Sequence, residues 1–378
     1  MGNQPFGARV QSFWRRVTEG LAINELWGQF RADARSSYRL YSRDVDSTQT
    51  AGMTGARRFF SIAVLFFWAV MEKLTPPRRI LLLLALVLLI LPVATWTTGR
   101  HGDETVSSPD FHLIAGILLF GLLIMEVGDR VVMKRDLQIA KEIQGWLLPT
   151  APPVVRGLEI AFATRPANTV AGDYYDVFPR TGSAAPGETF LIAIADVAGK
   201  SVPAALLMAS FQASLKTLSA LPGSLTELIA RLNGYACTNS QSGRRFTTAV
   251  LGEYEPVARR LEYVNAGHND PIVLRRSGAV EKLSVGGVPL GILTGAPYQS
   301  AQMTLEPGDW VALFTDGVIE AENLAQQQYS EERLVTMLRW GAAMPAPALL
   351  QAILADIDRF VQQAPQHDDI TCMLLRVV

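Results

Sequence analysis

The chain has 378 residues, of which 49% are apolar and 18% charged, with a formal net charge of −1. Average soluble chains carry about 25% charged residues. This composition excludes disordered and collagen-like chains, and the near-zero net charge gives no reason to expect a nucleic-acid partner. The charge is uneven, because residues 1–79 hold 12 Lys and Arg against 6 Asp and Glu. A basic start is typical of a chain whose N-terminal part faces a membrane.

Two apolar runs predict transmembrane helices. Residues 80–96 carry no charge, and residues 111–127 carry only Glu126 near their end. At about 1.5 Å per residue each run covers roughly 26 Å, close to the thickness of a bilayer core. Basic residues flank the pair, whereas the connecting loop 97–110 is acidic, so the positive-inside rule places both termini in the cytoplasm. The sequence thus predicts a multi-pass protein of the cytoplasmic (inner) membrane, with two buried core helices as the alternative.

Two further segments flank these spans. The run 59–71 lies within the basic N-terminal region 1–79 and is short and rich in Phe and Trp, which favours an interfacial helix. Residues 129–150 predict a linker helix that ends in prolines. An apolar stripe along this helix predicts pairing with a second copy in a homodimer, and the alternative is packing on its own domain. The stripe consists of Leu137, Ala140, Ile143 or Gln144, and Leu147.

Residues 151–378 have the pattern of a soluble α+β domain. Short runs rich in β-branched residues predict strands, and longer mixed segments predict helices. Strands outnumber helices and are spaced like hairpins, which favours antiparallel sheets with helices packed outside them. The predicted strands are 158–164, 189–195, 247–254, 261–265, 310–314 and 370–377, and the predicted helices are 203–218, 225–235, 331–340 and 348–361.

Aspartates recur where the predicted strands begin or end. Asp196 and Asp316 each follow a strand, Asp368 and Asp369 precede the last one, and Asp173 lies in a glycine-containing segment. Carboxylates with almost no histidine available are ligands typical of hard ions such as Mg²⁺ or Mn²⁺. Two such ions activate water and clamp a phosphoryl group. Taken singly, each aspartate more commonly serves as a turn residue or a helix cap.

Six motifs follow one another in the region of residues 137–378: AGDYYDVF, IADVAGKSVPAALLMA, YVNAGHNDP, GGVPLGI, LEPGDWVALFTDGVIEA and HDDIT. Together they resemble the SpoIIE/RsbU-type branch of the PPM metal-dependent Ser/Thr protein phosphatases. The run LQIAKEIQGWLLP also resembles the linker helix that precedes this domain in the family.

This resemblance implies an antiparallel β-sandwich flanked by helices, with two Mn²⁺ or Mg²⁺ ions between the sheets. It implies that the catalytic, metal-binding acids are Asp173, Asp196, Asp316 and Asp368, with the carbonyl of Val197 and the neighbouring Asp369 as further metal ligands. We therefore expect a membrane-anchored phosphatase that acts on phosphoserine or phosphothreonine of a signalling partner. By analogy the partner is a STAS-domain anti-anti-sigma factor, that is, an anti-sigma factor antagonist. The alternative is a catalytically idle regulatory or scaffold module of the same fold.

Three other motifs receive no catalytic role. The run 199–201 resembles the end of a P-loop, but Ile194 stands where that loop requires glycine, which leaves Lys200 as a candidate for substrate docking. Cys237 lacks the spacing of a cysteine-phosphatase loop and predicts a buried thiol at a helix end. The segment NAGHND around His268 predicts a turn between strands, in which the imidazole is hydrogen-bonded locally.

Overall fold

The computed structural model describes residues 64, 67–68, 70–91, 111–185, 187–239 and 245–378. These residues belong to two units, Met1–Arg130 and Val131–Val378. Residues 1–58, most of the predicted interfacial helix 59–71, the end of the first predicted span and the loop 97–110 lie outside the described residues.

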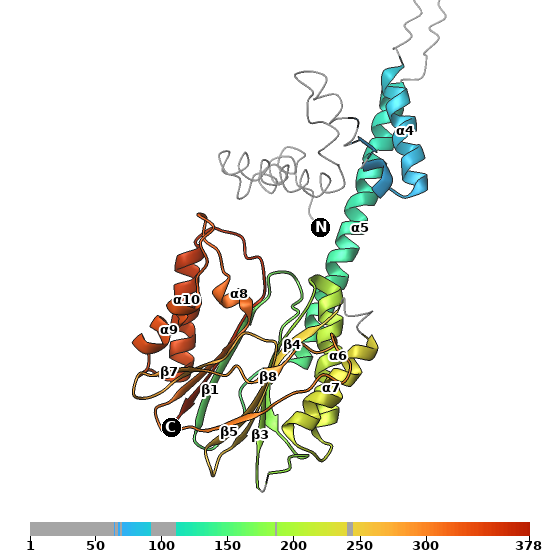
Figure 1. Cartoon of the computed structure of the whole chain (residues 1–378). Helices are drawn as coiled ribbons and strands as arrows, with labels where there is room; N and C mark the ends of the chain where they lie inside the picture. Colours follow the sequence, from blue (N-terminus) through green and yellow to red (C-terminus); the bar gives the residue numbers. More distant parts are fainter. Residues whose placement is uncertain (1–63, 65–66, 69, 92–110, 186, 240–244) are drawn as a thin grey trace, which may run out of the picture. The chain divides into compact units, whose positions relative to one another are not determined.

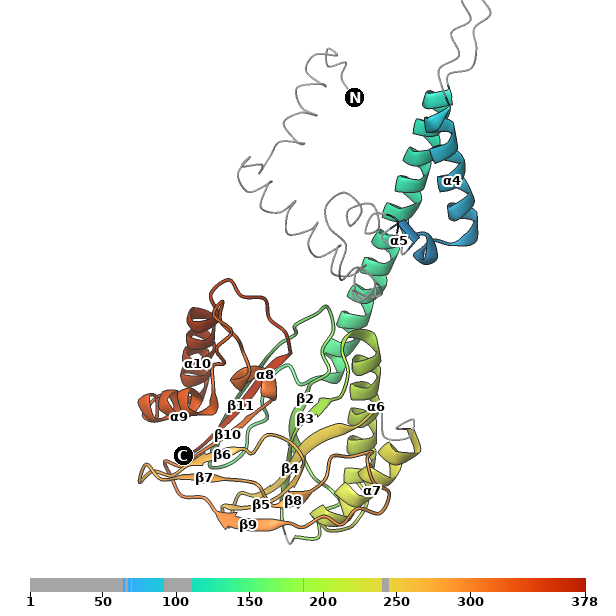
Figure 2. The same ribbon diagram turned by 45° about the horizontal axis from the view of Figure 1, so that its top comes forward.

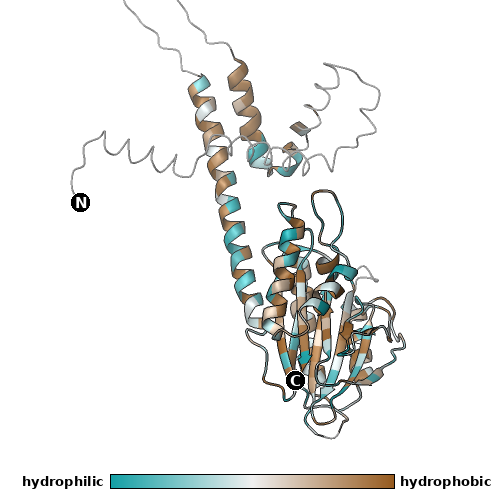
Figure 3. Cartoon of the chain, turned by 90° about the vertical axis from the view of Figure 1, so that its left-hand side faces the viewer, coloured by the Kyte–Doolittle hydropathy of each residue, from teal (hydrophilic) through white to brown (hydrophobic). Residues whose placement is uncertain are grey.

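The first unit contains two apolar helices. α4 (Pro76–Ile90) lies within the first predicted span and the basic segment before it, and α5 (Phe111–Leu147) begins with the second span. Arg78 of α4 forms ion pairs with Asp129 (2.7 Å) and Glu126 (3.5 Å) of α5. The guanidinium of Arg78 partly neutralises Glu126, which makes this acid tolerable near the end of an apolar helix. By length and composition α5 can cross a membrane, with an 18-residue window of mean hydropathy 2.1, and Figure 3 shows its apolar first half.

α5 is continuous through the second predicted span and the predicted linker helix. No proline interrupts residues 111–147, and Pro149 follows its last turn. In the linker part the buried residue is Gln144, whereas Ile143 is 47% exposed. The predicted stripe therefore runs through Gln144, with Leu137, Ala140 and Leu147 half-buried beside it.

The second unit is built from eleven strands and five further helices in the described residues, together with the end of α5. The strands are β1 (Leu158–Arg165), β2 (Tyr174–Pro179), β3 (Phe190–Val197), β4 (Thr247–Glu255), β5 (Arg260–Ala266), β6 (Ile272–Leu274), β7 (Val280–Lys282), β8 (Gly286–Gly287), β9 (Ala301–Thr304), β10 (Trp310–Phe314) and β11 (Ile370–Val377). The helices are α6 (Ser201–Ser219), α7 (Leu225–Asn239), α8 (Asp316–Ile319), α9 (Glu331–Trp340) and α10 (Ala346–Val361).

These elements form a four-layered sandwich. One sheet has the order β1-β11-β10-β6-β7, and the other has the order β2-β3-β4-β5-β8 with β9 paired to β5. The helices α6 and α7 cover the second sheet, and α9 and α10 cover the first (Figure 1). The predicted α+β sandwich of antiparallel sheets is confirmed, with β5 and β8 as a parallel exception.

Strand β3 shows how the core is divided between the layers. Ile192 and Ile194 lie in the core between the two sheets, whereas Leu191, Ala193 and Ala195 pack beneath α6 and α7. Successive side chains of a strand point to opposite faces, so a strand that is covered on both faces must be apolar throughout. This explains the uninterrupted run FLIAIA that precedes Asp196.

All six predicted strands and all four predicted helices of this domain are confirmed, with ends shifted by a few residues. The sequence analysis missed β2, the short strands β6 to β9, and α8. β2 contains an aspartate and ends in proline, which weakens the strand pattern. The other missed elements have two to four residues, too few for a recognisable period.

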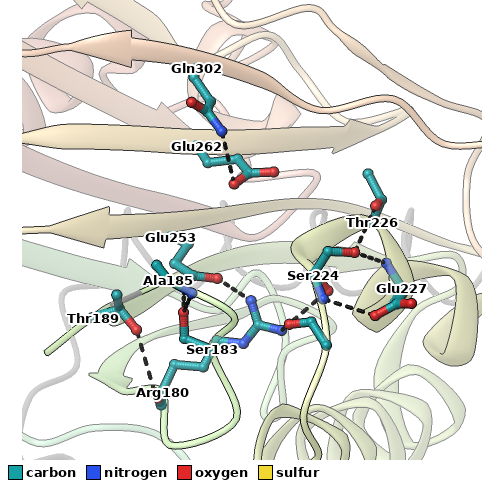
Figure 4. A network of polar contacts seen from close by, with 11 residues as sticks. Arg180, Ser183, Ala185, Thr189, Ser224, Thr226, Glu227, Glu253, Glu262 and Gln302 are labelled. Carbon is teal, nitrogen blue, oxygen red and sulfur yellow. Dashed lines mark hydrogen bonds and ion pairs between the residues drawn. The ribbon is translucent and has the colours of Figure 1, made fainter. Parts of the chain in front are cut away.

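A buried ion pair ties the second sheet to the turn between α6 and α7. Arg180 is buried and contacts Glu253 of β4, and its guanidinium also donates to the carbonyls of Gly223 (2.9 Å) and Ser224 (3.2 Å). Figure 4 shows this network, in which Ser183 is a second donor to Glu253. Removing one member of such a pair leaves an uncompensated buried charge.

We therefore predict that Glu253→Ala lowers the free energy of unfolding by about 3–5 kcal/mol, measured by urea titration of tryptophan fluorescence. The matched control is Glu262→Ala, on the strand paired with β4 at the position opposite Glu253. Glu262 contacts Gln302 in an exposed hydrogen bond, so its loss should cost less than about 1 kcal/mol. Equal losses in the two variants would contradict the prediction.

Candidate metal centre

Five aspartates from both sheets meet at one end of the sandwich. Asp173 precedes β2 and Asp196 lies near the end of β3, and these strands are antiparallel neighbours with Tyr174 opposite Ala195. Asp316 follows β10, and residues 368–369 precede β11. These two strands are also antiparallel neighbours, with Phe314 opposite Cys372. Antiparallel pairing thus brings the end of one strand next to the start of its neighbour in each sheet. The fold therefore brings together aspartates that lie in separate sequence motifs.

The carboxylates influence one another electrostatically. Burial, reinforced by the charges of Asp316, Asp368 and Asp369, raises the pKa of Asp196 to about 7. Burial and the neighbouring Asp196 raise the pKa of Asp173 well above its usual range. The pKa of Asp316 is raised by burial and by Asp368. Buried like charges at short range disfavour ionisation, and a divalent cation among these oxygens would reverse that effect.

Two aspartates are fixed by donors from other elements. Asp369 accepts hydrogen bonds from the backbone N–H groups of Ala167 (2.7 Å) and Gly172 (2.6 Å), so both of its oxygens are engaged. Asp173 accepts a hydrogen bond from the Thr315 hydroxyl (2.9 Å). Asp369, expected as a further metal ligand, thus uses both oxygens to brace the loop before β2, so we assign the ligand role to the other four aspartates and keep its metal contact as an untested prediction.

Gly172 provides space beside the expected ligands. A Cβ at this position would lie 3.2 Å from the carbonyl oxygen of Val197 and 3.8 Å from a carboxylate oxygen of Asp196. Because Gly172 has no side chain, the loop before Asp173 can approach both of these oxygens closely. All the donors named are hard oxygen atoms, so the residues fit Mg²⁺ or Mn²⁺.

One carboxylate is held by a cation of the protein itself. The Lys200 ammonium contacts Asp368 (3.0 Å) and donates to the carbonyl of His367 (2.7 Å). Within the described residues no group of three or more His, Cys, Asp or Glu side chains is arranged to hold a metal ion as it stands. A divalent ion on Asp368 would compete with Lys200 for this carboxylate.

α5 contacts the loop that carries Asp173. The side-chain amide of Gln144 donates to the carbonyl of Ala171 (2.7 Å) and accepts from its N–H (2.9 Å), so it pairs with the backbone as a neighbouring strand would. The sequence pattern alone does not predict this contact, although it leaves Ile143 and Gln144 as alternatives for one position of the apolar stripe. Nor does it predict the hydrogen bond of Thr315 to Asp173 or the bracing role of Asp369.

Comparison with known proteins identifies the family of the chain. The family model of stage II sporulation protein E (SpoIIE) matches residues 186–378, which is half of the chain. The chain belongs to the SpoIIE family. With the relatives below, this places it in the SpoIIE/RsbU branch of the PPM-type phosphatases.

The similar proteins include named phosphatases. The phosphoserine phosphatase RsbU of Bacillus subtilis is 27% identical over 281 residues, covering 72% of this chain and 80% of RsbU. Protein IcfG of Synechocystis is 25% identical over 277 residues, covering 66% of this chain but only 42% of IcfG. The SiaA-PP2C domain of Pseudomonas aeruginosa has the same fold, with a TM-score of 0.56 at 21% identity, covering 66% of this chain and 98% of that domain.

His268, in the third motif of this family member, serves a structural purpose. Its Nε2 lies 3.1 Å from the carbonyl of Phe314, which can only accept, so Nε2 carries the proton and Nδ1 accepts from the Thr248 hydroxyl (2.8 Å). The prediction of local hydrogen bonding was wrong, because both partners of the imidazole lie on other strands, 20 and 46 positions away. Cys237 lies in the last turn of α7, half-buried rather than fully buried as expected.

Burial lowers the pKa of His268 to about 4, against about 6.5 in an unfolded chain. As the pH falls below 6.5 the unfolded state takes up this proton first, so the native state loses stability down to about pH 4. We predict that between pH 7 and pH 4.5 the wild type loses about 2 kcal/mol more unfolding free energy than His268→Gln. The buried aspartates titrate in both proteins and cancel in this difference. Equal losses would show that His268 is not buried as a neutral ring.

Proposed function

We propose that this chain is a metal-dependent protein phosphatase that hydrolyses phosphoserine or phosphothreonine on a partner protein. The observation that carries the proposal is the meeting of Asp173, Asp196, Asp316 and Asp368 at one end of the sandwich, where Gly172 lets the loop of Asp173 approach Asp196 and Val197 closely. When bound there, two Mn²⁺ or Mg²⁺ ions supply the Lewis acidity that activates water and neutralises phosphoryl charge.

In this reaction water adds to phosphorus, the bond from phosphorus to the serine or threonine oxygen breaks, and the products are the free hydroxyl and inorganic phosphate. The four aspartates and the Val197 carbonyl would hold the ions. Asp369 keeps the loop of Asp173 in place through Ala167 and Gly172, and Thr315 orients the Asp173 carboxylate. No side chain needs to carry the phosphoryl group, so Cys237 has no part in this chemistry.

The second candidate function is a catalytically idle module that binds a signalling partner. The complete set of acids favours the phosphatase, because a scaffold has no need for several buried carboxylates that repel one another. Calorimetric titration with Mn²⁺ beside a turnover assay separates the two functions.

For the phosphatase we predict that Asp196→Asn keeps the fold but retains less than about a tenth of the wild-type rate of p-nitrophenyl phosphate hydrolysis with Mn²⁺. The amide preserves size and removes the charge that offsets the ions, so Mn²⁺ affinity should fall as well. Glu306→Gln, an exposed charge loss in the turn before β10, is the matched control and should leave both quantities unchanged. Chelation should abolish wild-type turnover, and a rate in Asp196→Asn above a tenth would refute this assignment.

We further propose that the chain is anchored in the cytoplasmic membrane through α4 and α5, with both termini in the cytoplasm. The apolar character of α5 and the basic residues at the outer ends of the two spans support this orientation. The phosphorylated partner would be a STAS-domain anti-anti-sigma factor, which rests on the resemblance to the RsbU-type phosphatases.

A homodimer through α5 completes the proposal. Of the two alternatives in the predicted stripe, Gln144 contacts the domain, so the side chains available for pairing are an exposed face at helical spacing that includes Ile143. It consists of Val132 (58% exposed), Ile139 (45%), Ile143 (47%) and Trp146 (80%). Paired spans in a membrane would raise the local concentration of this face enough for a short seam to form.

We predict that Ile143→Asp lowers the yield of crosslinked dimer in membranes at least about fivefold, because it places a charge in the seam. Gln138→Asp, also at an exposed position but about 140° around the helix from Ile143, is the matched control and should leave the yield unchanged. An unchanged yield in Ile143→Asp would show that α5 is only a tether.

A further inference from the structure

Lys200 occupies a special position at the edge of the aspartate cluster. It lies between the Asp196–Val197 segment and α6, and the residues on both sides of it have positive φ values, +128° at Gly199 and +62° at Ser201. A serine rarely adopts this left-handed conformation, so the surrounding fold holds the segment in place. The ammonium is thereby brought to Asp368 on the opposite sheet.

The same ammonium acts on two further acids of the cluster. Its positive charge opposes the upward shifts in the pKa values of Asp196 and Asp316. Although it is paired, the Lys200 side chain is 59% exposed, so it faces solvent as well as the acids. A cation that is both exposed and adjacent to the reaction centre can meet an incoming anion.

A groove begins at Lys200. It has a volume of about 570 Å³ and runs between α8 and the C-terminal end of α10, which Figure 2 shows side by side. The second cation on its wall, Arg165, is paired with Asp358 of α10. Asp358 is not among the expected metal ligands, whereas Asp368, the partner of Lys200, is one of them. A metal ion on Asp368 would therefore weaken the hold of that carboxylate on Lys200, whereas the pair of Arg165 with Asp358 would be unaffected.

We propose that Lys200 binds the phosphoryl group of the substrate, with the neighbouring residues of the phosphorylated segment lying in the groove. The proposal rests on the phosphatase function above and adds a substrate-contacting residue to it. A phosphate monoester carries up to two negative charges, and an ammonium is a point-charge donor suited to its oxygens. Lys200 thus changes partner, from the Asp368 carboxylate in the absence of substrate to the phosphate in its presence.

The test measures binding apart from turnover. The probe is a fluorescein-labelled alanine–glycine peptide with one non-hydrolysable phosphonate analogue of phosphoserine. Its Kd for the full chain in detergent with Mn²⁺ is read by fluorescence anisotropy. Lys200→Gln should raise this Kd about tenfold, and Lys200→Arg should keep it within about threefold of the wild type. Lys282→Gln is the matched control, because Lys282 is also an exposed lysine paired with a carboxylate, that of Glu331, and should leave the Kd unchanged.

Calorimetric titration of each variant with Mn²⁺ completes the design. Lys200→Gln should bind Mn²⁺ as tightly as the wild type or more tightly, because it removes a cation that competes for Asp368. An unchanged peptide Kd in Lys200→Gln would overturn the proposal. A raised Kd together with weaker Mn²⁺ binding would also overturn it, since Lys200 would then act by positioning Asp368. A wild type that binds the probe through Lys200 but hydrolyses no phosphate ester would refute the phosphatase function and leave this inference standing.

Discussion

The structure of the candidate site depends on the repulsion among carboxylates that the sandwich buries together. The pKa values of Asp173, Asp196 and Asp316 are raised by burial and, in each case, by the charge of at least one other aspartate of the cluster. A fold does not gather such groups for stability, because buried unpaired charge is costly. The arrangement makes physical sense as a binding site for cations, and the rest of the domain supplies the framework that keeps the acids in place despite their repulsion.

That framework consists of backbone donors and strand register. Asp369 gives both of its oxygens to the segment around Ala167 and Gly172, so the last strand holds the loop of the first acid. Thr315 connects the other sheet to the same acid, and its hydroxyl also accepts from the N–H of Thr371. The two sheets are thereby joined at the edge where the acids meet, in addition to the apolar core between them.

The helix α5 joins this framework through one side chain. Gln144 pairs with both backbone groups of Ala171, two residues before Asp173. A change in the C-terminal part of α5 would therefore reach the acid loop through two hydrogen bonds. The same helix has a different exposed apolar face around Ile143, so the surface available to a partner and the surface in contact with the domain are separate. This separation would allow pairing without breaking the contact to the site.

The sequence by itself determined the class of the domain and its long strands and helices, whereas the roles expected of the acids came from the resemblance of the motifs to a known family. The elements follow from local patterns, since an apolar run such as FLIAIA can be read without neighbours in space. Only the tertiary structure decided which side of α5 is buried, that Asp369 braces a loop, and that Lys200 faces Asp368 across the sheets. Each of these depends on contacts between residues 27 to 197 positions apart. Periodicity along one helix cannot distinguish Ile143 from Gln144, because adjacent residues border the same stripe until a partner surface selects one of them.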